Sequence, residues 1–328
     1  MDSPEAACDQ CAGDPVDVAS GVYHTSSTTD VRLVGAYGDD LGVRRQYSSG
    51  ARGVAQLPLD PATDGRGISF VGSRWSHNYQ TRIVDQRPQG GGIGLVVEDG
   101  RWLQFTLSGS MWSPPPGNSA VLEVLGANAG VSDCDMAYPG GFKVTLRDGR
   151  AFFYNASGRF ARWQNAVGKG VCAGYDAAGR LKYLRNDSRQ AVAFEYYLAP
   201  EQHGQAGELK ALHLADTSGN PKPGKRVVTY EYDATQLTAA RREAWVATGE
   251  DDSYQYGGGS NQDLLTRVAR GEGATEKVTY CAQATAGCGA TGSPDQVQAL
   301  RSATAALTFE YGSWSGCGAV MPAGTTSA

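Results

Sequence analysis

A tyrosine that recurs at regular intervals restricts the fold of this chain more than any other feature. Successive copies are 21, 21, 36, 24, 24 and 31 residues apart, at Tyr154, Tyr175, Tyr196, Tyr232, Tyr256, Tyr280 and Tyr311. The longer intervals contain loop-forming stretches such as residues 218–224, which hold two glycines and two prolines. A period of roughly 20–50 residues is typical of proteins that repeat one supersecondary unit. The second half of the chain is therefore expected to be an array of similar units.

The residues around each tyrosine indicate that this unit is a β-hairpin. Two positions before the tyrosine, five copies carry an aromatic residue and one a β-branched residue: Phe152, Phe194, Tyr230, Tyr254 and Phe309, and Val278. Residues i and i−2 of a strand share one face, so each pair forms an apolar stripe. A turn and a second apolar motif follow, as at Leu181 and Leu209. Segments of about six residues between turn signals are too short for stable helices, which favours strand, tight turn and strand.

Repeated hairpins must cover one another, because a lone hairpin is at best marginally stable in water. We therefore predict an all-β fold in which antiparallel hairpins form one continuous curved sheet. The composition agrees with many short elements joined by turns, since 44 of the 328 residues are glycine, about twice the usual share.

Charge and hydropathy exclude several classes of protein. The net charge of −5 argues against a broad nucleic-acid-binding surface. No apolar run approaches the length of about 18 residues that a membrane-spanning helix needs. Residues 1–5 have neither the basic region nor the apolar region of a classical signal peptide.

Residues 175–181 read Y-D-A-A-G-R-L and resemble the YD-repeat signature of Rhs proteins, Y-D-x-x-G-R-L. Diverged copies begin at Tyr154 and Tyr232, while Tyr256 and Tyr280 keep the tyrosine without the aspartate. The first third of the chain resembles, in three ordered segments, the domain that commonly precedes Rhs repeats. The first segment, 13–21, opens with Gly13, Asp14 and Pro15. The second, 44–49, is similar to R-x-Y-N-S, with serine in place of asparagine. The third, 72–79, is similar to G-x-G-W-S-H-N-Y: its matching residues include Trp75, His77, Asn78 and Tyr79, and arginine at 74 departs from the pattern.

The resemblance identifies the chain as the N-terminal region of an Rhs/YD-repeat protein, and it implies a structural role. In that family the repeats wind into a hollow β-shell that encloses a C-terminal toxin segment or is presented at a cell surface. This chain would form part of such a shell in bacterial competition, secreted or at the cell surface, without enzymatic activity or cofactors. Its partners would be the rest of a larger Rhs polypeptide or its toxin segment, and a secretion apparatus.

The resemblance and the spacing together predict five regions along the chain. They are an N-terminal segment (1–12), a β-rich domain preceding the repeats (13–100), connecting hairpins (101–150), the YD repeats (151–315) and a truncated tail (316–328).

Few residues are candidates for chemistry, and we expect no catalytic or metal-binding residue. His77 follows Ser76 directly, and neighbouring residues of a strand point to opposite faces, which is not the geometry of a catalytic triad. His24, His203 and His213 have no evident partners. The pairs Asp39–Asp40 and Asp251–Asp252 lie in Gly- and Ser-rich segments and are expected to be solvated turns.

The seven cysteines suggest a disulfide more readily than a zinc site. Cys8 and Cys11 have the spacing of half a zinc site, but a second close pair is lacking. Cys281 and Cys288 are the candidate disulfide, provided that the compartment is oxidising.

Two other functions fit a β-repeat chain. A surface adhesion or carbohydrate-binding module would use exposed tyrosines with Trp163 or Trp245 as stacking platforms, whereas packed tyrosines would be architectural. A hydrolase on a β scaffold is disfavoured by the presence of only four histidines. If the array is architectural, the repeat tyrosines should pack on one face, with Tyr311 less buried because no unit follows it.

Overall fold

The computed structural model describes residues 16, 22–26, 29–49, 72, 74–97, 102–109, 111–126, 140–243, 251–257, 264–271, 273–281, 297–302, 306–311 and 320–326. These residues form strands and turns almost throughout, and the one helical segment among them is the short 3-10 helix η1 (Arg87–Gln89). The predicted all-β fold is therefore confirmed. Within the described part of the chain, no helix has the length and apolarity needed to cross a membrane.

The strands fall into an N-terminal group and a long meander. The N-terminal group comprises β1 (His24–Ser26), β2 (Val31–Leu33), β3 (Leu41–Val43), β4 (Arg45–Ser48) and β5 (Trp75–His77). The first part of the meander comprises β6 (Arg82–Asp85), β7 (Ile93–Val96), β8 (Trp102–Ser108), β9 (Met111–Ser113), β10 (Val121–Val124), β11 (Phe142–Thr145), β12 (Ala151–Tyr154), β13 (Phe160–Gln164), β14 (Gly170–Tyr175) and β15 (Leu181–Asn186). The second part comprises β16 (Ala191–Tyr196), β17 (Leu209–Ala215), β18 (Pro221–Asp233), β19 (Gln236–Arg242), β20 (Asp252–Tyr256), β21 (Leu265–Ala269), β22 (Thr275–Tyr280), β23 (Val297–Arg301), β24 (Ala306–Tyr311) and β25 (Val320–Thr326).

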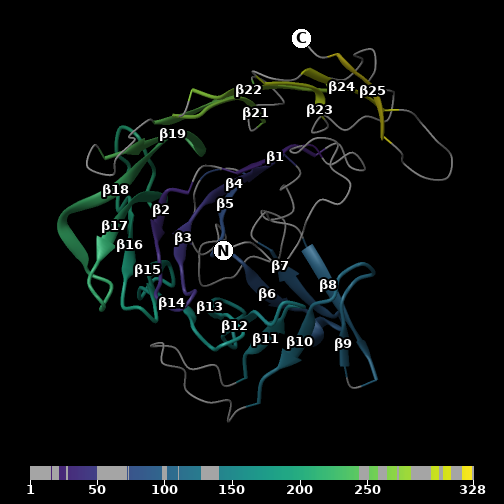
Figure 1. Cartoon of the computed structure of the whole chain (residues 1–328), viewed down its shortest axis with the longest axis vertical. Helices are drawn as coiled ribbons and strands as arrows, with labels where there is room; N and C mark the ends of the chain where they lie inside the picture. The colour runs from purple at the N-terminus through teal and green to yellow at the C-terminus, as the bar shows by residue number, and fades with distance from the viewer. Residues whose placement is uncertain are drawn as a thin grey trace.

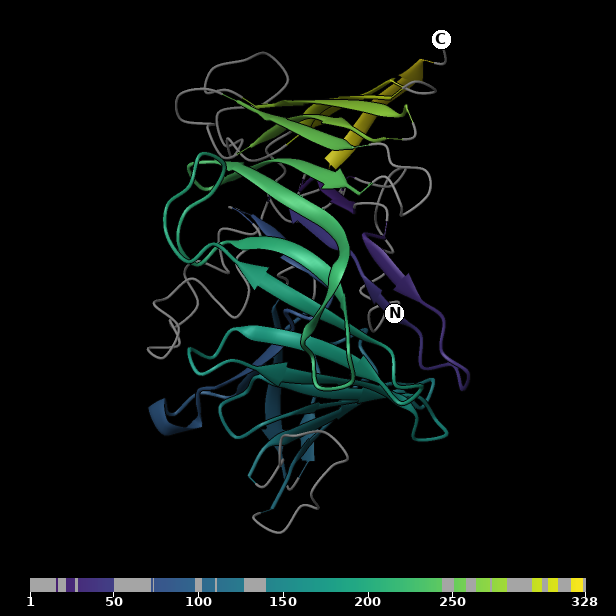
Figure 2. The same cartoon turned by 90° about the vertical axis from the view of Figure 1, so that its left-hand side faces the viewer.

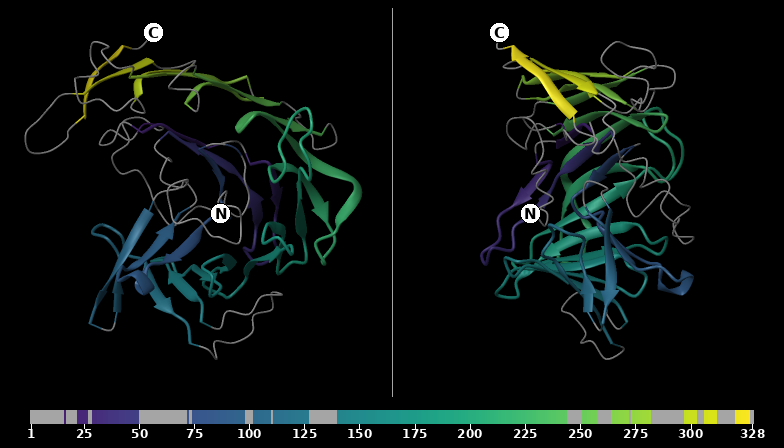
Figure 3. Two further views of the ribbon diagram at one scale, coloured as in Figure 1. Left: turned by 180° about the vertical axis from the view of Figure 1, so that it is seen from behind. Right: turned by 90° about the vertical axis from the view of Figure 1, so that its right-hand side faces the viewer.

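From β6 to β25, each strand pairs antiparallel with the next strand in the chain. The sheet begins before the repeats, because β6 and β7 pair into it, and β25 in the 316–328 region pairs with β24. Figure 1 shows the sheet curving around the N-terminal strands, and Figure 3 shows the same arrangement from behind. Seen from the side in Figure 2, the repeat strands lie one above another like rungs.

The N-terminal group lies on the concave side of the meander (Figure 1). It consists of a three-stranded sheet in the order β1-β4-β5 and the separate hairpin β2-β3. Most buried apolar side chains of both groups belong to one continuous cluster that extends from Val16 to Leu300, and Ala191, Ala193 and Ala215 form a small separate cluster. The space inside the curve is therefore a packed core that both groups share.

A five-residue turn with an asparagine or aspartate at its start joins the strands of many hairpins. The side-chain Oδ1 accepts the backbone N–H four residues later, over 2.8–2.9 Å, in the turns that begin at Asn155, Asn165, Asp176, Asn186 and Asp216. The fourth residue has a positive φ, and it is glycine in four of the five turns. The side-chain acceptor and the glycine thus account for the D-x-x-G part of the signature.

Gly158 has a second role, because the backbone of β6 passes directly over it. Ile83 donates its N–H to the carbonyl of Gly158 over 2.8 Å. A Cβ on Gly158 would lie 2.0 Å from the carbonyl oxygen of Ile83. Together with the bridge between Arg82 and Arg159, this contact joins the first strand of the meander to the turn between β12 and β13.

Candidate functional site

Six of the repeat tyrosines occupy equivalent places in their hairpins. Each lies at the end of the first strand or, for Tyr232, one residue before it, directly after a one-residue shift in register. Each pairs with the first residue of the second strand or, for Tyr232, with the second residue. The pairs are Tyr154–Phe160, Tyr175–Leu181, Tyr196–Leu209, Tyr232–Leu237, Tyr256–Leu265 and Tyr280–Val297. Tyr311 pairs with Val320, but the register shift in its strand comes earlier, and its side chain lies outside the described residues.

The tyrosine hydroxyls link each hairpin to the one before it. Each hydroxyl donates to the backbone carbonyl of the residue that pairs with the tyrosine of the preceding unit. The bonds are Tyr175–Phe160 (2.7 Å), Tyr196–Leu181 (2.9 Å), Tyr232–Leu209 (2.8 Å), Tyr256–Leu237 (2.7 Å) and Tyr280–Leu265 (3.0 Å). We call this series of bonds the tyrosine ladder. It makes the tyrosine a connector between units as well as a core residue.

The first tyrosine of the series bonds to the segment after β5. The hydroxyls of Tyr154 and Thr81 lie 2.9 Å apart. Thr81 gives its own proton to the carbonyl of Val96, over 2.8 Å, so Tyr154 is the donor to Thr81. Thr81 therefore supplies the acceptor that a preceding repeat supplies elsewhere.

Burial keeps the ladder phenols protonated. Desolvation raises the pKa of Tyr154 and Tyr175, and it raises the pKa of Tyr232, Tyr256 and Tyr280 well above the ordinary value. Each of these hydroxyls therefore stays a hydrogen-bond donor across the physiological pH range.

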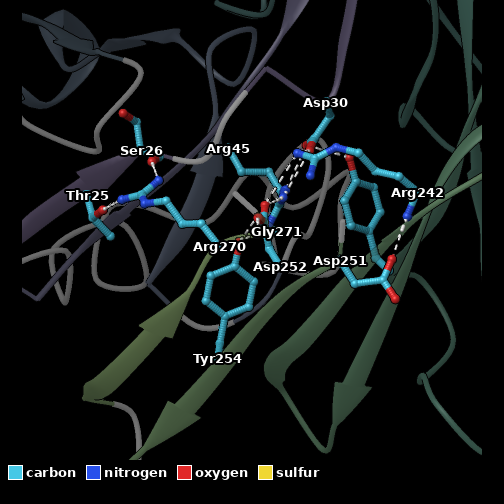
Figure 4. A network of polar contacts seen from close by, with 11 residues as sticks. Thr25, Ser26, Asp30, Arg45, Arg242, Asp251, Asp252, Tyr254, Arg270 and Gly271 are labelled. Atoms are coloured by element: carbon cyan, nitrogen blue, oxygen red, sulfur yellow. Dashed lines mark hydrogen bonds and ion pairs between the residues drawn. The ribbon is translucent and has the colours of Figure 1, made fainter. Parts of the chain in front are cut away.

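A buried ion cluster joins the N-terminal strands to β18–β20. Arg45 of β4 donates from Nε to Asp30 Oδ2 (2.7 Å) and from Nη2 to Asp30 Oδ1 (2.9 Å) and Asp252 Oδ2 (3.0 Å). Figure 4 shows the Arg45 guanidinium between these two carboxylates. Arg242 of β19 also reaches both carboxylates: its Nη2 lies 3.6 Å from Asp30 Oδ1 and 3.4 Å from Asp252 Oδ2. The cluster holds two positive and two negative charges and is neutral as a whole.

Three aromatic rings complete the surroundings of Arg45. Its Cζ atom lies 5.7 Å from the ring centre of Trp75, 5.3 Å from that of Tyr230 and 5.5 Å from that of Tyr254. Arg45 also donates to the hydroxyl of Tyr254 (2.6 Å), and Tyr230 donates to Asp30 (2.9 Å). Burial alone would lower the pKa of Arg45, but the adjacent Asp30 carboxylate outweighs it, and the pKa is raised well above its ordinary value.

Of the four matching residues singled out in the segment 72–79, three contact the repeats. Trp75 donates from Nε1 to the Tyr256 hydroxyl (2.8 Å) and packs edge-on against Tyr254. The rings of His77 and Tyr79 lie 5.6 Å from Phe194 and Phe160, respectively. The fourth match, Asn78, instead bonds to the N-terminal group, accepting from the N–H of Arg44 (3.0 Å) and donating to the carbonyl of Gly42 (2.8 Å). Gly13, Asp14 and Pro15 lie outside the described residues.

His77 is fully buried. Its Nδ1 accepts the N–H of Tyr79 over 3.1 Å, and its Nε2 has no hydrogen-bond partner among the described residues. Burial lowers the pKa of His77 to about 3, so the ring is neutral at physiological pH. His213 bonds through Nε2 to Glu195 Oε2 over 2.6 Å, in a surface pair between neighbouring strands.

The prediction that both acidic pairs are solvated turns is wrong for Asp39 and Asp252. Asp39 is fully buried, and it accepts bonds from the N–H (2.6 Å) and the hydroxyl (3.0 Å) of Ser188 in a repeat turn. Asp252 is 1% exposed in the ion cluster. Their partners are about 150 and 200 residues away in the chain, so local sequence gave no signal for either contact.

Only some of the cysteines and tryptophans singled out in the sequence are among the described residues. Cys281 is buried and disulfide-bonded, as is Cys172 on β14, whereas Cys288 lies outside the described residues. Cys8, Cys11 and Trp245 lie outside them as well. Trp163 is buried in the core. Among the described residues, no group of histidine, cysteine, aspartate and glutamate side chains is arranged to hold a metal ion.

The profile of a domain of unknown function, DUF6531, matches residues 13–105. No curated protein matches the sequence. The chain is similar to a solved structure of TcdB2-TccC3-Cdc42, with 10% identity and a TM-score of 0.35, over 94% of this chain and 19% of that one. It is also similar to the N-terminal domain of the effector protein SpvB from Salmonella typhimurium strain LT2, with 11% identity and a TM-score of 0.23, over 92% of this chain and 99% of that one. This chain thus spans about a fifth of the length of the first structure.

Proposed function

We propose that this chain is a non-enzymatic structural segment of an exported Rhs/YD-repeat protein, secreted or at the cell surface. In this role it forms part of the wall of a β-shell that encloses or presents a toxin segment in bacterial competition. The observation that carries the proposal is the tyrosine ladder, because it ties each hairpin to its predecessor by the same bond. A sheet that extends by one repeated contact is suited to building a wall whose length depends only on the number of units.

The burial of the aromatic residues favours this architectural role over a carbohydrate-binding surface. Sugar-stacking platforms need aromatic faces that are open to solvent. The rings of Tyr154, Tyr196, Tyr232 and Tyr280 are at most 7% exposed, and Trp163 is 5% exposed. Their faces are used for packing within the chain.

Limited proteolysis of the natural full-length protein that contains this segment tests the shell. The double change Tyr196→Ser and Tyr232→Ser removes two rungs of the ladder, and Tyr37→Ser, at a ring 59% exposed, is the matched control. We expect sequence that follows the repeats to be protected in the wild type and in the control, and to be digested in the double variant. Equal digestion in all three proteins would contradict the proposal.

A further inference from the structure

The surroundings of Arg45 have the chemistry of a receptor for a guanidinium ion. We infer that this aromatic and acidic cage is a guanidinium-binding site that the chain fills with its own Arg45, and that Arg45 is the latch holding the N-terminal strands on the repeat sheet. The inference is independent of the proposed shell, because it concerns only contacts within this chain.

The cage is assembled from two parts of the chain. The N-terminal group supplies Asp30 and Trp75, and the repeat sheet supplies Tyr230 from β18, Arg242 from β19, and Asp252 and Tyr254 from β20. About 200 residues separate Arg45 from the sheet residues that it contacts. One side chain therefore connects two regions that are remote in sequence.

The geometry of the cage selects a planar fork over a point charge. Asp30 receives two N–H groups from one edge of Arg45, and Asp252 and the Tyr254 hydroxyl receive one each. A guanidinium presents five donors in one plane and stacks on aromatic faces, whereas an ammonium does neither. The aromatic ring centres within 6 Å add cation–π attraction in a site that excludes water.

The charge balance shows why the latch depends on Arg45. With Arg45 removed, Asp30 and Asp252 would share the single positive charge of Arg242, leaving one uncompensated negative charge. The side chains of Asp30 and Asp252 are 0% and 1% exposed, so water cannot solvate that charge without opening the contact. An added guanidinium ion has the charge and shape to replace the missing group.

Chemical rescue of Arg45→Ala tests the site. We expect guanidinium chloride, on the order of 20 mM, to raise the melting temperature of this variant by about 3 °C or more. Urea at the same concentration is the neutral planar control, methylammonium is the cation without a fork, and the wild type has the cage already filled. A rise with guanidinium in the variant alone supports the site, and equal responses to all three solutes would overturn it. Asp252→Asn added to Arg45→Ala should reduce the rescue.

Amide hydrogen exchange tests the latch. In Arg45→Ala, amides of β1 and β4 should lose protection while those of β14–β16 keep it, and guanidinium should restore the loss. If Arg45→Ala does not fold in any solute, Tyr254→Phe removes only one acceptor of the latch, and Tyr175→Phe removes a hydroxyl from the ladder as the matched control. Faster exchange of β1 and β4 in Tyr254→Phe than in Tyr175→Phe supports the latch. Unchanged exchange in the latch variants would overturn it.

Discussion

At the scale of single residues, buried charge is what most distinguishes this chain from a simple hairpin array. Arg45 and its carboxylate partners are inaccessible to water, and their charges balance once Arg242 is included. Arg45→Met keeps much of the length of the side chain but leaves the carboxylates unbalanced, so it should lower the free energy of unfolding by about 3–5 kcal/mol. Arg241→Met, at a pair whose arginine is 53% exposed, should cost at most about 1 kcal/mol. Urea denaturation of the two variants measures both effects, and equal losses would contradict this account.

His77 gives the molecule a predictable response to acid. Burial lowers its pKa to about 3 in the folded state, against about 6.5 when unfolded, so the unfolded chain binds a proton that the folded chain does not. The contribution of neutral His77 to the free energy of unfolding is fully present above pH 6.5. It should fall by up to about 1.4 kcal/mol per pH unit as the pH is lowered from 6.5 to 3. Comparing the pH dependence of unfolding in the wild type with that of His77→Gln isolates this contribution. Parallel curves for the two proteins would show that His77 does not titrate in this range.

At the scale of elements, the hairpin units can be tested through their connecting hydroxyl. Tyr196→Phe removes a buried bond of 2.9 Å to Leu181 and should cost about 1 kcal/mol, whereas Tyr196→Ala should cost about 3–5 kcal/mol through lost packing. Tyr37→Phe, at an exposed ring, is the control and should change little. Thermal or chemical unfolding measures the loss of unfolding free energy in each of the three variants. A negligible loss of stability in Tyr196→Ala would be inconsistent with a connecting role.

The turns offer a matched pair of glycines. Gly158 and Gly168 both have φ of 78°, so alanine is strained in either place. A Cβ on Gly168 meets open space, whereas one on Gly158 lies 2.0 Å from the carbonyl oxygen of Ile83. Gly168→Ala should cost about 1 kcal/mol from backbone strain, and Gly158→Ala should cost clearly more because β6 must move. Similar losses in unfolding free energy for the two variants would mean that β6 yields easily.

The sequence predicted these elements far better than it predicted the contacts between them. Strand alternation, the D-x-x-G turn and the tyrosine spacing are local, so the hairpins and the equivalence of Tyr154 to Tyr280 could be expected from the residues alone. The described residues between 22 and 81 pack inside the curve without any repeating sequence pattern that could predict their contacts. Asp252 illustrates the difference: it follows another aspartate in a stretch between Gly249 and Ser253, and it is buried through contacts that include the distant Arg45.

At the scale of the whole molecule, the N-terminal strands touch several successive repeats and should make them unfold together. Contacts run from Thr81–Tyr154 through His77–Phe194 to Tyr23–Glu276. An array held only by neighbouring units would instead open from its ends. We expect amides of β4 and β16 to exchange with the same free energy as urea is raised in the wild type, and β4 to open at lower free energy in Arg45→Met. A β4 that already opens independently in the wild type would contradict this coupling.

The ladder also gives the molecule a direction. Each ladder hydroxyl from Tyr175 to Tyr280 donates backwards, to a carbonyl that precedes it in the chain, and the hydroxyl of Tyr154 donates to Thr81. During synthesis, which proceeds from the N-terminus, each new hairpin would find its acceptor already made and would itself present the next one. In this order of folding, Thr81 would supply the first acceptor, and the residue paired with each tyrosine would supply the acceptor for the next hairpin. The ladder bonds can therefore form in the order in which the chain leaves the ribosome, whereas the Arg45 contacts form only after Asp252 and Tyr254 have been translated.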